Sequence, residues 1–107
     1  TEEMTLRRET EEESGIVDLT VFPHRVSIRY FYVAKGTERE KRQHKGQGIW
    51  VFKVVHFYPA ETKTEAVVLS HEHQGFIWEE YEAAQKRVTF ENAKRVLRET
   101  EEYLNRR

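Results

Sequence analysis

The clearest pattern in the chain is a two-residue alternation along residues 25–34, which is the period of a β-strand. Its two faces hold Val26, Ile28, Tyr30 and Tyr32 on one side, and Ser27, Arg29, Phe31 and Val33 on the other. Residues 49–58 are almost all β-branched or aromatic, which predicts a second, largely buried strand. Shorter extended segments are expected at residues 16–22, before Pro23, and at residues 65–69.

Helical patterns stand at both ends of the chain. Residues 1–14 are rich in Glu, Arg, Leu and Met, and Gly15 follows where the end of a helix favours glycine. A short helix is expected at residues 79–85, and a longer one after Thr89, a candidate N-cap. The order of helix, strands and helices predicts one mixed α/β domain over residues 1–107.

Polar segments separate these elements. Residues 35–48 combine three glycines with many charges and are expected to form a loop, as are residues 59–64 and 70–75. Hydrophobic residues make up 37% of the chain and charged residues 35%, which is enough apolar material for a modest core. The net charge of −1 gives no overall field that would attract nucleic acid or a membrane. Eighteen Lys and Arg residues are nevertheless available to gather around a phosphate ligand.

The absence of cysteine excludes disulfides, zinc–thiolate sites and thiol nucleophiles. It is also compatible with a reducing compartment, and a cytoplasmic location is expected. No stretch approaches the roughly 20 apolar residues of a membrane span. The charged, helix-like N-terminus does not have the pattern of a signal peptide.

Three glutamates give the first helix a chemical character. Glu9, Glu12 and Glu13 are spaced so that a helix places them on one face, where their charges repel one another. A divalent cation reverses this balance, and magnesium prefers oxygen ligands from a few carboxylates together with substrate phosphates. Arg8 precedes Glu12 by four residues and is placed to orient its carboxylate. The alternative is a solvated acidic face, the commoner role of a run of charges.

The string RETEEESGI at residues 8–16 resembles the C-terminal half of the Nudix box, G-x5-E-x7-R-E-U-x-E-E-x-G-U, where U is a bulky aliphatic residue. Six of its nine positions match, namely Arg8, Glu9, Glu12, Glu13, Gly15 and Ile16. Thr10 departs from the pattern, because an aliphatic residue is usual there. The leading glutamate of the box would stand just before Thr1. The resemblance therefore implies that this glutamate, the glycine loop and the first strands of the fold lie upstream.

A second segment, LSHEHQ at residues 69–74, is similar to the C-terminal region of the diadenosine tetraphosphate hydrolases, the asymmetrical bis(5′-nucleosyl)-tetraphosphatase branch of the family. In that branch a His-Glu-His-Gln loop precedes a tryptophan, here Trp78, and two short helical segments. The resemblance implies a Nudix-type α/β/α sandwich with a mixed sheet, lacking its N-terminal strands in this chain. It also implies hydrolysis of a phosphoanhydride bond, foremost of diadenosine tetraphosphate to ATP and AMP.

The resemblance assigns roles to the acidic residues. Magnesium or manganese is expected on Glu9, Glu12 and Glu13, with Arg8 beside them in the catalytic group. The metal would activate a water molecule for attack on phosphorus, and a carboxylate would take its proton. Glu72 is the expected further ligand or general base, and the alternative for it is an exposed loop carboxylate.

Substrate contacts are expected from cations and rings. Lys45 and Lys53 lie on or beside the central strands and are candidates for the polyphosphate, although Lys53 equally suits a surface position. Trp50 is a candidate to stack on adenine, against the alternative that it belongs to the core. His71 and His73 are expected to contact phosphate or hydrogen-bond within their loop. Zinc is rejected because H-x-H without a third ligand at a matching spacing is a weak signal.

Three other interpretations remain open. The first is another Nudix enzyme, acting on RNA 5′ ends, nucleotide sugars or nucleoside triphosphates. The second is a nucleotide-binding Nudix domain without turnover, and the third is a structural protein with a chance match. The expected partner is a small nucleotide, with no membrane and no nucleic acid apart from an RNA 5′ end. The sequence does not decide between monomer and dimer.

Overall fold

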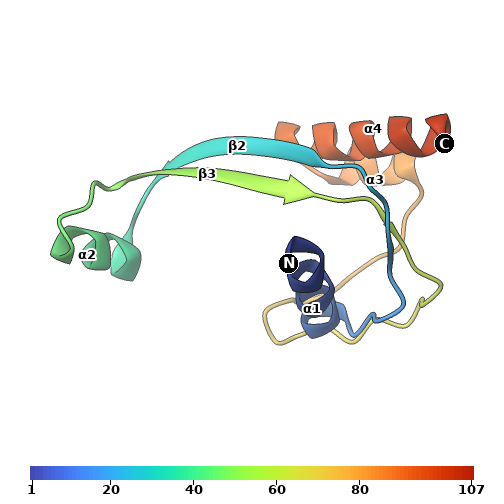
Figure 1. The fold of residues 1–107 in the computed structure, drawn as a ribbon, viewed down its shortest axis with the longest axis horizontal. Coiled ribbons are helices and arrows are strands. Elements are labelled where there is room, and N and C mark those ends of the chain that lie inside the picture. Colours follow the sequence, from blue (N-terminus) through green and yellow to red (C-terminus); the bar gives the residue numbers. More distant parts are fainter.

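The computed structural model describes all residues 1–107 and contains four helices and four strands (Figure 1). In chain order the elements are α1 (Glu2–Ser14), β1 (Thr20–Val21), β2 (Val26–Val33), α2 (Gly36–His44), β3 (Trp50–Phe57), β4 (Ala60–Glu61), α3 (Tyr81–Arg87) and α4 (Glu91–Arg106). The strands form two separate antiparallel pairs, β1 with β4 and β2 with β3. The expected mixed class is confirmed as α+β, with no closed sheet.

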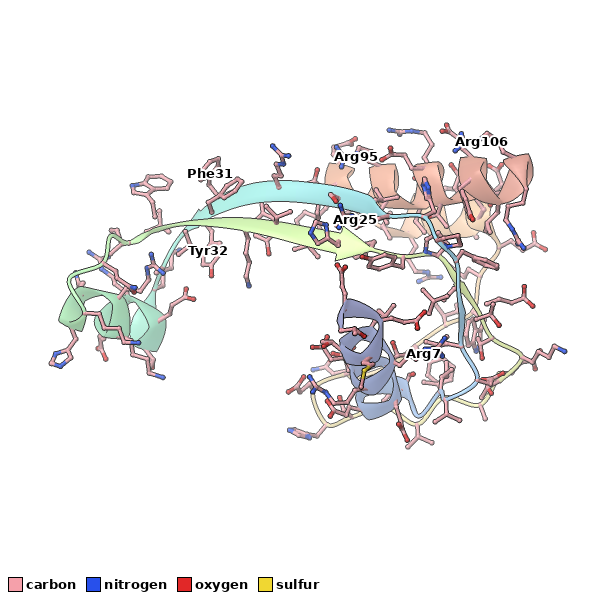
Figure 2. The ribbon with its side chains drawn as sticks, in the orientation of Figure 1. Arg7, Arg25, Phe31, Tyr32, Arg95 and Arg106 are labelled. Carbon is pink, nitrogen blue, oxygen red and sulfur yellow. The ribbon has the colours of Figure 1, made fainter.

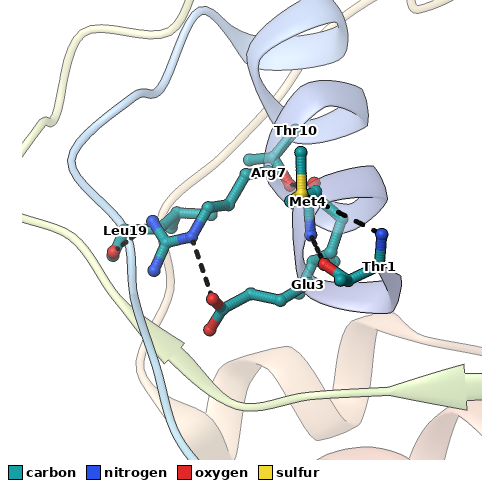
Figure 3. A network of polar contacts seen from close by, with 7 residues as sticks. Thr1, Glu3, Met4, Arg7, Thr10 and Leu19 are labelled. Carbon is teal, nitrogen blue, oxygen red and sulfur yellow. Dashed lines mark hydrogen bonds and ion pairs between the residues drawn. The ribbon is translucent and has the colours of Figure 1, made fainter.

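Helix α1 has the expected bounds because both of its ends are capped. The Thr1 hydroxyl accepts a hydrogen bond from the Met4 amide at 3.1 Å. At the other end Gly15 is left-handed (φ 75°), and its amide donates to the Glu11 carbonyl at 2.8 Å. Figure 3 shows Arg7 reaching from the helix to the Leu19 carbonyl, which ties α1 to the segment before β1.

Strands β2 and β3 form a long hairpin whose register runs from Val26 opposite Phe57 to Val33 opposite Trp50. The pairing confirms the two faces expected for β2. The prediction that residues 49–58 are largely buried is wrong, since Trp50 is 68% exposed. The physical reason is that the hairpin is a sheet of only two strands, so much of this run has no packing partner.

Residues 35–48 were expected to be a loop, and this is wrong because they contain α2. The residues between the glycines include good helix formers such as Glu, Arg, Lys and Gln. Gly36 (φ 58°) and Gly46 (φ 73°) stand at the start of the helix and just beyond its end. The glycines therefore mark the boundaries of a helix instead of breaking it.

Two extended segments also differ from expectation. Residues 65–69 form no strand, and the expected turn at residues 59–64 contains the short strand β4. Of residues 16–22, only the two residues of β1 pair as a strand. Residues 65–69 lack a sheet neighbour, but the Val68 amide donates to the Ser14 carbonyl at 2.9 Å. Their extended chain is thus held by the end of a helix.

Helix α4 packs on the start of the hairpin, and α3 packs on α4. Thr89 is not the N-cap of α4, because the helix begins one residue later, after Phe90, with no side-chain cap. Arg95 donates to the Ser27 carbonyl of β2, and Tyr103 stacks on His24 with ring centroids 4.3 Å apart. Figures 1 and 3 place α1 and α4 on opposite sides of the end of β3.

The molecule is extended, with few buried side chains. Five residues are buried, including Ile16, Phe22, Val26 and Ala34. The radius of gyration is 16.5 Å, against about 13 Å expected for a compact domain of this length. The difference comes from residues 26–57, here called the hairpin arm, which carry α2 away from the other helices (Figure 1). None of the helices has the length and apolar content needed to cross a bilayer.

Candidate functional site

The acidic face of α1 is organised by one arginine. The Arg8 guanidinium lies 3.8 Å from a Glu12 carboxylate oxygen and 4.0 Å from a Glu9 carboxylate oxygen. All three side chains are exposed, so these pairs add little to the stability of the fold. Both carboxylates lie near the same positive charge.

Glu13 faces a different neighbour. With Ser14 and Ile16 it lines an open pocket of about 330 Å³, whose other walls come from residues 67–78. The backbone fixes this arrangement, since the Ser70 amide donates to the Glu13 carbonyl at 3.3 Å and the next contact, from Val68 to Ser14, is also a hydrogen bond. Gly15 permits the approach, because a Cβ there would lie 3.3 Å from the Val68 Cβ.

The His-Glu-His loop contributes one side chain to this pocket. His73 lines it together with Trp78, and the His73 amide closes a turn onto the Ser70 carbonyl at 3.1 Å. His71 and Glu72 are exposed in that turn and do not line the pocket. The structure thus places Glu13 and His73 at the same open pocket, whereas Glu72 does not line it.

The expected substrate contacts on the hairpin arm lie away from α1. Lys45 follows the end of α2, and Trp50 begins β3 beside it. The Lys53 ammonium group lies 5.8 Å from the centre of the Tyr32 ring on the same face of the sheet. Figure 1 shows the arm projecting from the rest of the molecule, so the structure does not bring these three residues to the glutamates.

A small pocket beside Glu9 contains residues that the sequence did not single out. Its volume is about 140 Å³, and it includes His56 and Tyr58 from the end of the hairpin. A hydrogen bond with Glu2 and desolvation raise the pKa of the Tyr58 hydroxyl. The His56 ring nitrogen Nδ1 lies 2.7 Å from the Ser27 hydroxyl. Both residues end an apolar run, and no spacing in the sequence relates them to α1.

The donor set suits a hard divalent cation, although the three glutamates do not meet at one point. No group of three or more acidic or histidine side chains converges in the structure. Magnesium is commonly held by one or two carboxylates together with substrate phosphates. Glu9 and Glu12, which both lie near Arg8, fit this ion in the kind and number of their donors. A ligand role for Glu13 stays a prediction.

Comparison of the chain with protein-family models, curated proteins and solved structures gave no match.

Proposed function

We propose that the protein is a magnesium-dependent hydrolase of the Nudix type, which cleaves a phosphoanhydride bond in a nucleotide, foremost diadenosine tetraphosphate to ATP and AMP. One observation carries the proposal. The two sequence segments that resemble this family, residues 8–16 and 69–78, are far apart in the chain and yet pack against each other at the end of α1. Neither local pattern required that proximity.

The arrangement of elements is compatible with the sandwich expected for this family. α1 and α4 lie on opposite sides of the end of β3 (Figures 1 and 3). We infer that these two helices are the outer layers and that the base of the β2–β3 pair, which lies between them, is part of the central sheet. Further strands would be needed to complete a mixed sheet.

The residues of α1 are given separate tasks in this proposal. Glu9 and Glu12 would hold magnesium, and Arg8 would keep the two carboxylates directed toward it. The bound ion would neutralise charge on the phosphate oxygens and lower the pKa of a water molecule. His73 would contact the phosphate chain from the pocket wall. Two carboxylates are candidates to accept the proton of the attacking water. They are Glu13, which lines the pocket, and Glu72, which lies in the His-Glu-His loop.

The test uses the full-length protein that contains this sequence. It is incubated with diadenosine tetraphosphate and magnesium, and the products are separated by ion-exchange chromatography. ATP and AMP are expected in equal amounts. Glu12→Gln should lower kcat by several orders of magnitude, because metal activation supplies several kcal/mol of transition-state stabilisation. Glu11→Gln removes the same charge from an exposed position of the same helix and should leave the rate unchanged.

Full activity of the Glu12→Gln variant, with unchanged circular dichroism, would show that the assignment of the site is wrong. Capped RNA, nucleotide sugars and nucleoside triphosphates are run in parallel. Faster turnover of one of these compounds would support the hydrolase activity and show that diadenosine tetraphosphate is not the preferred substrate. If calorimetry shows magnesium-dependent binding of diadenosine tetraphosphate and no product forms, the protein is a nucleotide-binding domain and not an enzyme.

A further inference from the structure

The positive charge of the chain is concentrated at the tip of the hairpin arm. Residues 35–48 hold five Lys or Arg residues and two glutamates, a net charge of +3, which leaves −4 for the rest of the chain. The overall charge of −1 conceals this separation. A local positive field at the end of a projecting arm attracts phosphate-bearing partners whatever the net charge of the whole molecule.

Three of the five basic side chains of the tip gather at one pocket. Lys41, Arg42 and Lys45 border an open pocket of about 350 Å³ that has no hydrophobic lining. Arg42 also donates to the Gly48 carbonyl at 2.6 Å, which fixes the return of the chain toward β3. The remaining lining residues are Thr37, Glu38 and Gln47. Its basic side chains suit charged oxygen atoms.

A row of exposed aromatic rings lies next to this tip. Phe31, Trp50 and Phe52 occupy one face of the hairpin and are 69%, 68% and 52% exposed. The Phe31 and Phe52 ring centroids are 4.9 Å apart. Arg29 is exposed on the same face at the far end of the row. Figure 2 shows Phe31 and Tyr32 pointing to opposite sides of the sheet.

Helix α2 leaves this row uncovered. The Tyr32 hydroxyl donates to the Glu38 carboxylate at 3.1 Å, so α2 bends toward the face opposite the three rings. Glu38 also lines the basic pocket, so this pocket lies toward the Tyr32 face, and Arg29 is the cation on the face of the rings. Large exposed apolar groups next to charged ones are typical of an interaction surface.

We propose that the hairpin arm binds single-stranded nucleic acid, with bases stacked on Phe31, Trp50 and Phe52, phosphates held by Arg29, and the strand continuing around the arm to the cations of the tip. Folds that bind single strands combine a basic track with aromatic stacking platforms. A duplex would leave the rings unused because its bases are already stacked. A mononucleotide would occupy one ring of the row. The proposal uses no residue of α1 and does not depend on hydrolase activity.

The test measures the fluorescence anisotropy of labelled oligonucleotides of about 12 nucleotides, within the site sizes of roughly 4–16 nucleotides that single-strand binders cover. Uridine RNA, thymidine DNA and a DNA duplex of the same length are titrated without magnesium, so that hydrolysis plays no part. We expect the single strands to bind at least tenfold more tightly than the duplex. Affinity should fall with rising salt.

Two variants separate the contributions of charge and stacking. Changing the exposed Lys35, Lys41 and Lys45 to Gln should weaken binding at least tenfold and lower the salt slope by about 2, since each phosphate contact on a single strand contributes about 0.7. Trp50→Leu keeps an apolar side chain and should weaken binding about tenfold by loss of stacking. The matched control changes the same number of exposed cations on α3 and α4, namely Lys86, Arg98 and Arg106, to Gln.

Each outcome decides the proposal. Equal losses in the tip variant and in the control variant would show attraction by net charge alone and would overturn it. Tighter binding of the duplex, no effect of Trp50→Leu, or no binding of either single strand would overturn it as well. Circular dichroism of every variant verifies that the fold is kept, and the salt dependence of the unmodified protein gives a readout that needs no variant.

Discussion

At the scale of single residues, the only aspartate of the chain holds two segments together. The Asp18 carboxylate accepts hydrogen bonds from the Thr62 and Thr64 hydroxyls, both at 2.6 Å, and from the Lys63 amide at 2.9 Å. These bonds, foremost that of Thr62, hold the pKa of Asp18 well below its usual range. Asp18 thereby joins the segment after α1 to the segment after β4.

Because its pKa is low in the folded protein, the stability that Asp18 contributes to the fold depends on pH. The carboxylate is favoured in the folded state, so its contribution is complete above the unfolded pKa of about 3.9 and is lost as the pH falls toward the folded pKa. Asp18→Asn should therefore lower the melting temperature at pH 7, and the difference from the unmodified protein should shrink below about pH 4. Thermal unfolding followed by circular dichroism between neutral and acidic pH measures both curves.

Glu102→Gln serves as the control for this residue, because Glu102 is exposed on α4. The melting temperature of this variant should stay close to that of the unmodified protein at every pH. If the melting temperatures of Asp18→Asn and the unmodified protein differed by a constant amount down to strongly acid pH, the stabilising role of the Asp18 carboxylate would be contradicted.

At the scale of elements, the end of α1 fixes the position of the backbone of residues 67–70. The left-handed Gly15 turns the chain out of the helix, and its missing side chain lets Val68 approach. The backbone bond from Val68 to Ser14 then seats the following loop beside Glu13. One glycine thus contributes both to helix termination and to the assembly of the candidate site.

Replacing Gly15 tests this double role. Gly46→Ala is the matched control, because its φ is 73° and its Cβ would meet nothing within 4 Å. The control should lose about 1 kcal/mol from the left-handed backbone alone. Gly15→Ala should lose about 1 kcal/mol more, since its Cβ also presses on Val68. Urea unfolding curves give both values, and equal losses would show that the contact with Val68 is not tight.

At the scale of the whole molecule, the hairpin arm dominates the shape. The accessible surface is 8646 Å², whereas a compact monomer of this mass exposes about 6,300 Å². The excess is compatible with an arm that exposes both faces of a two-stranded sheet. An element with few packing neighbours has low local stability and is available for binding.

Small-angle X-ray scattering measures this shape directly. At low protein concentration the radius of gyration should lie near 16.5 Å and clearly above the value of about 13 Å for a compact chain. A dilution series is the control, because association through the exposed rings would make the radius depend on concentration. A value near 13 Å would mean that the arm folds back onto the helices.

The sequence by itself determined the features that depend on neighbours within a few residues. These are α1 with its end at Gly15, the alternating faces of β2 and the presence of helices near the C-terminus. Their causes are capping, propensity and period, all of which act locally. The same local information also placed the three glutamates on one helix, where two of them lie near Arg8.

Only the tertiary structure decided which distant residues meet. It placed His73 and Glu13 at one pocket, left Glu72 outside it, and separated Lys45, Lys53 and Trp50 from α1. It also left the run of β3 largely uncovered, although its composition is that of a core strand. Burial and proximity depend on what packs against an element. That is set by contacts between segments far apart in the chain, which no local pattern encodes.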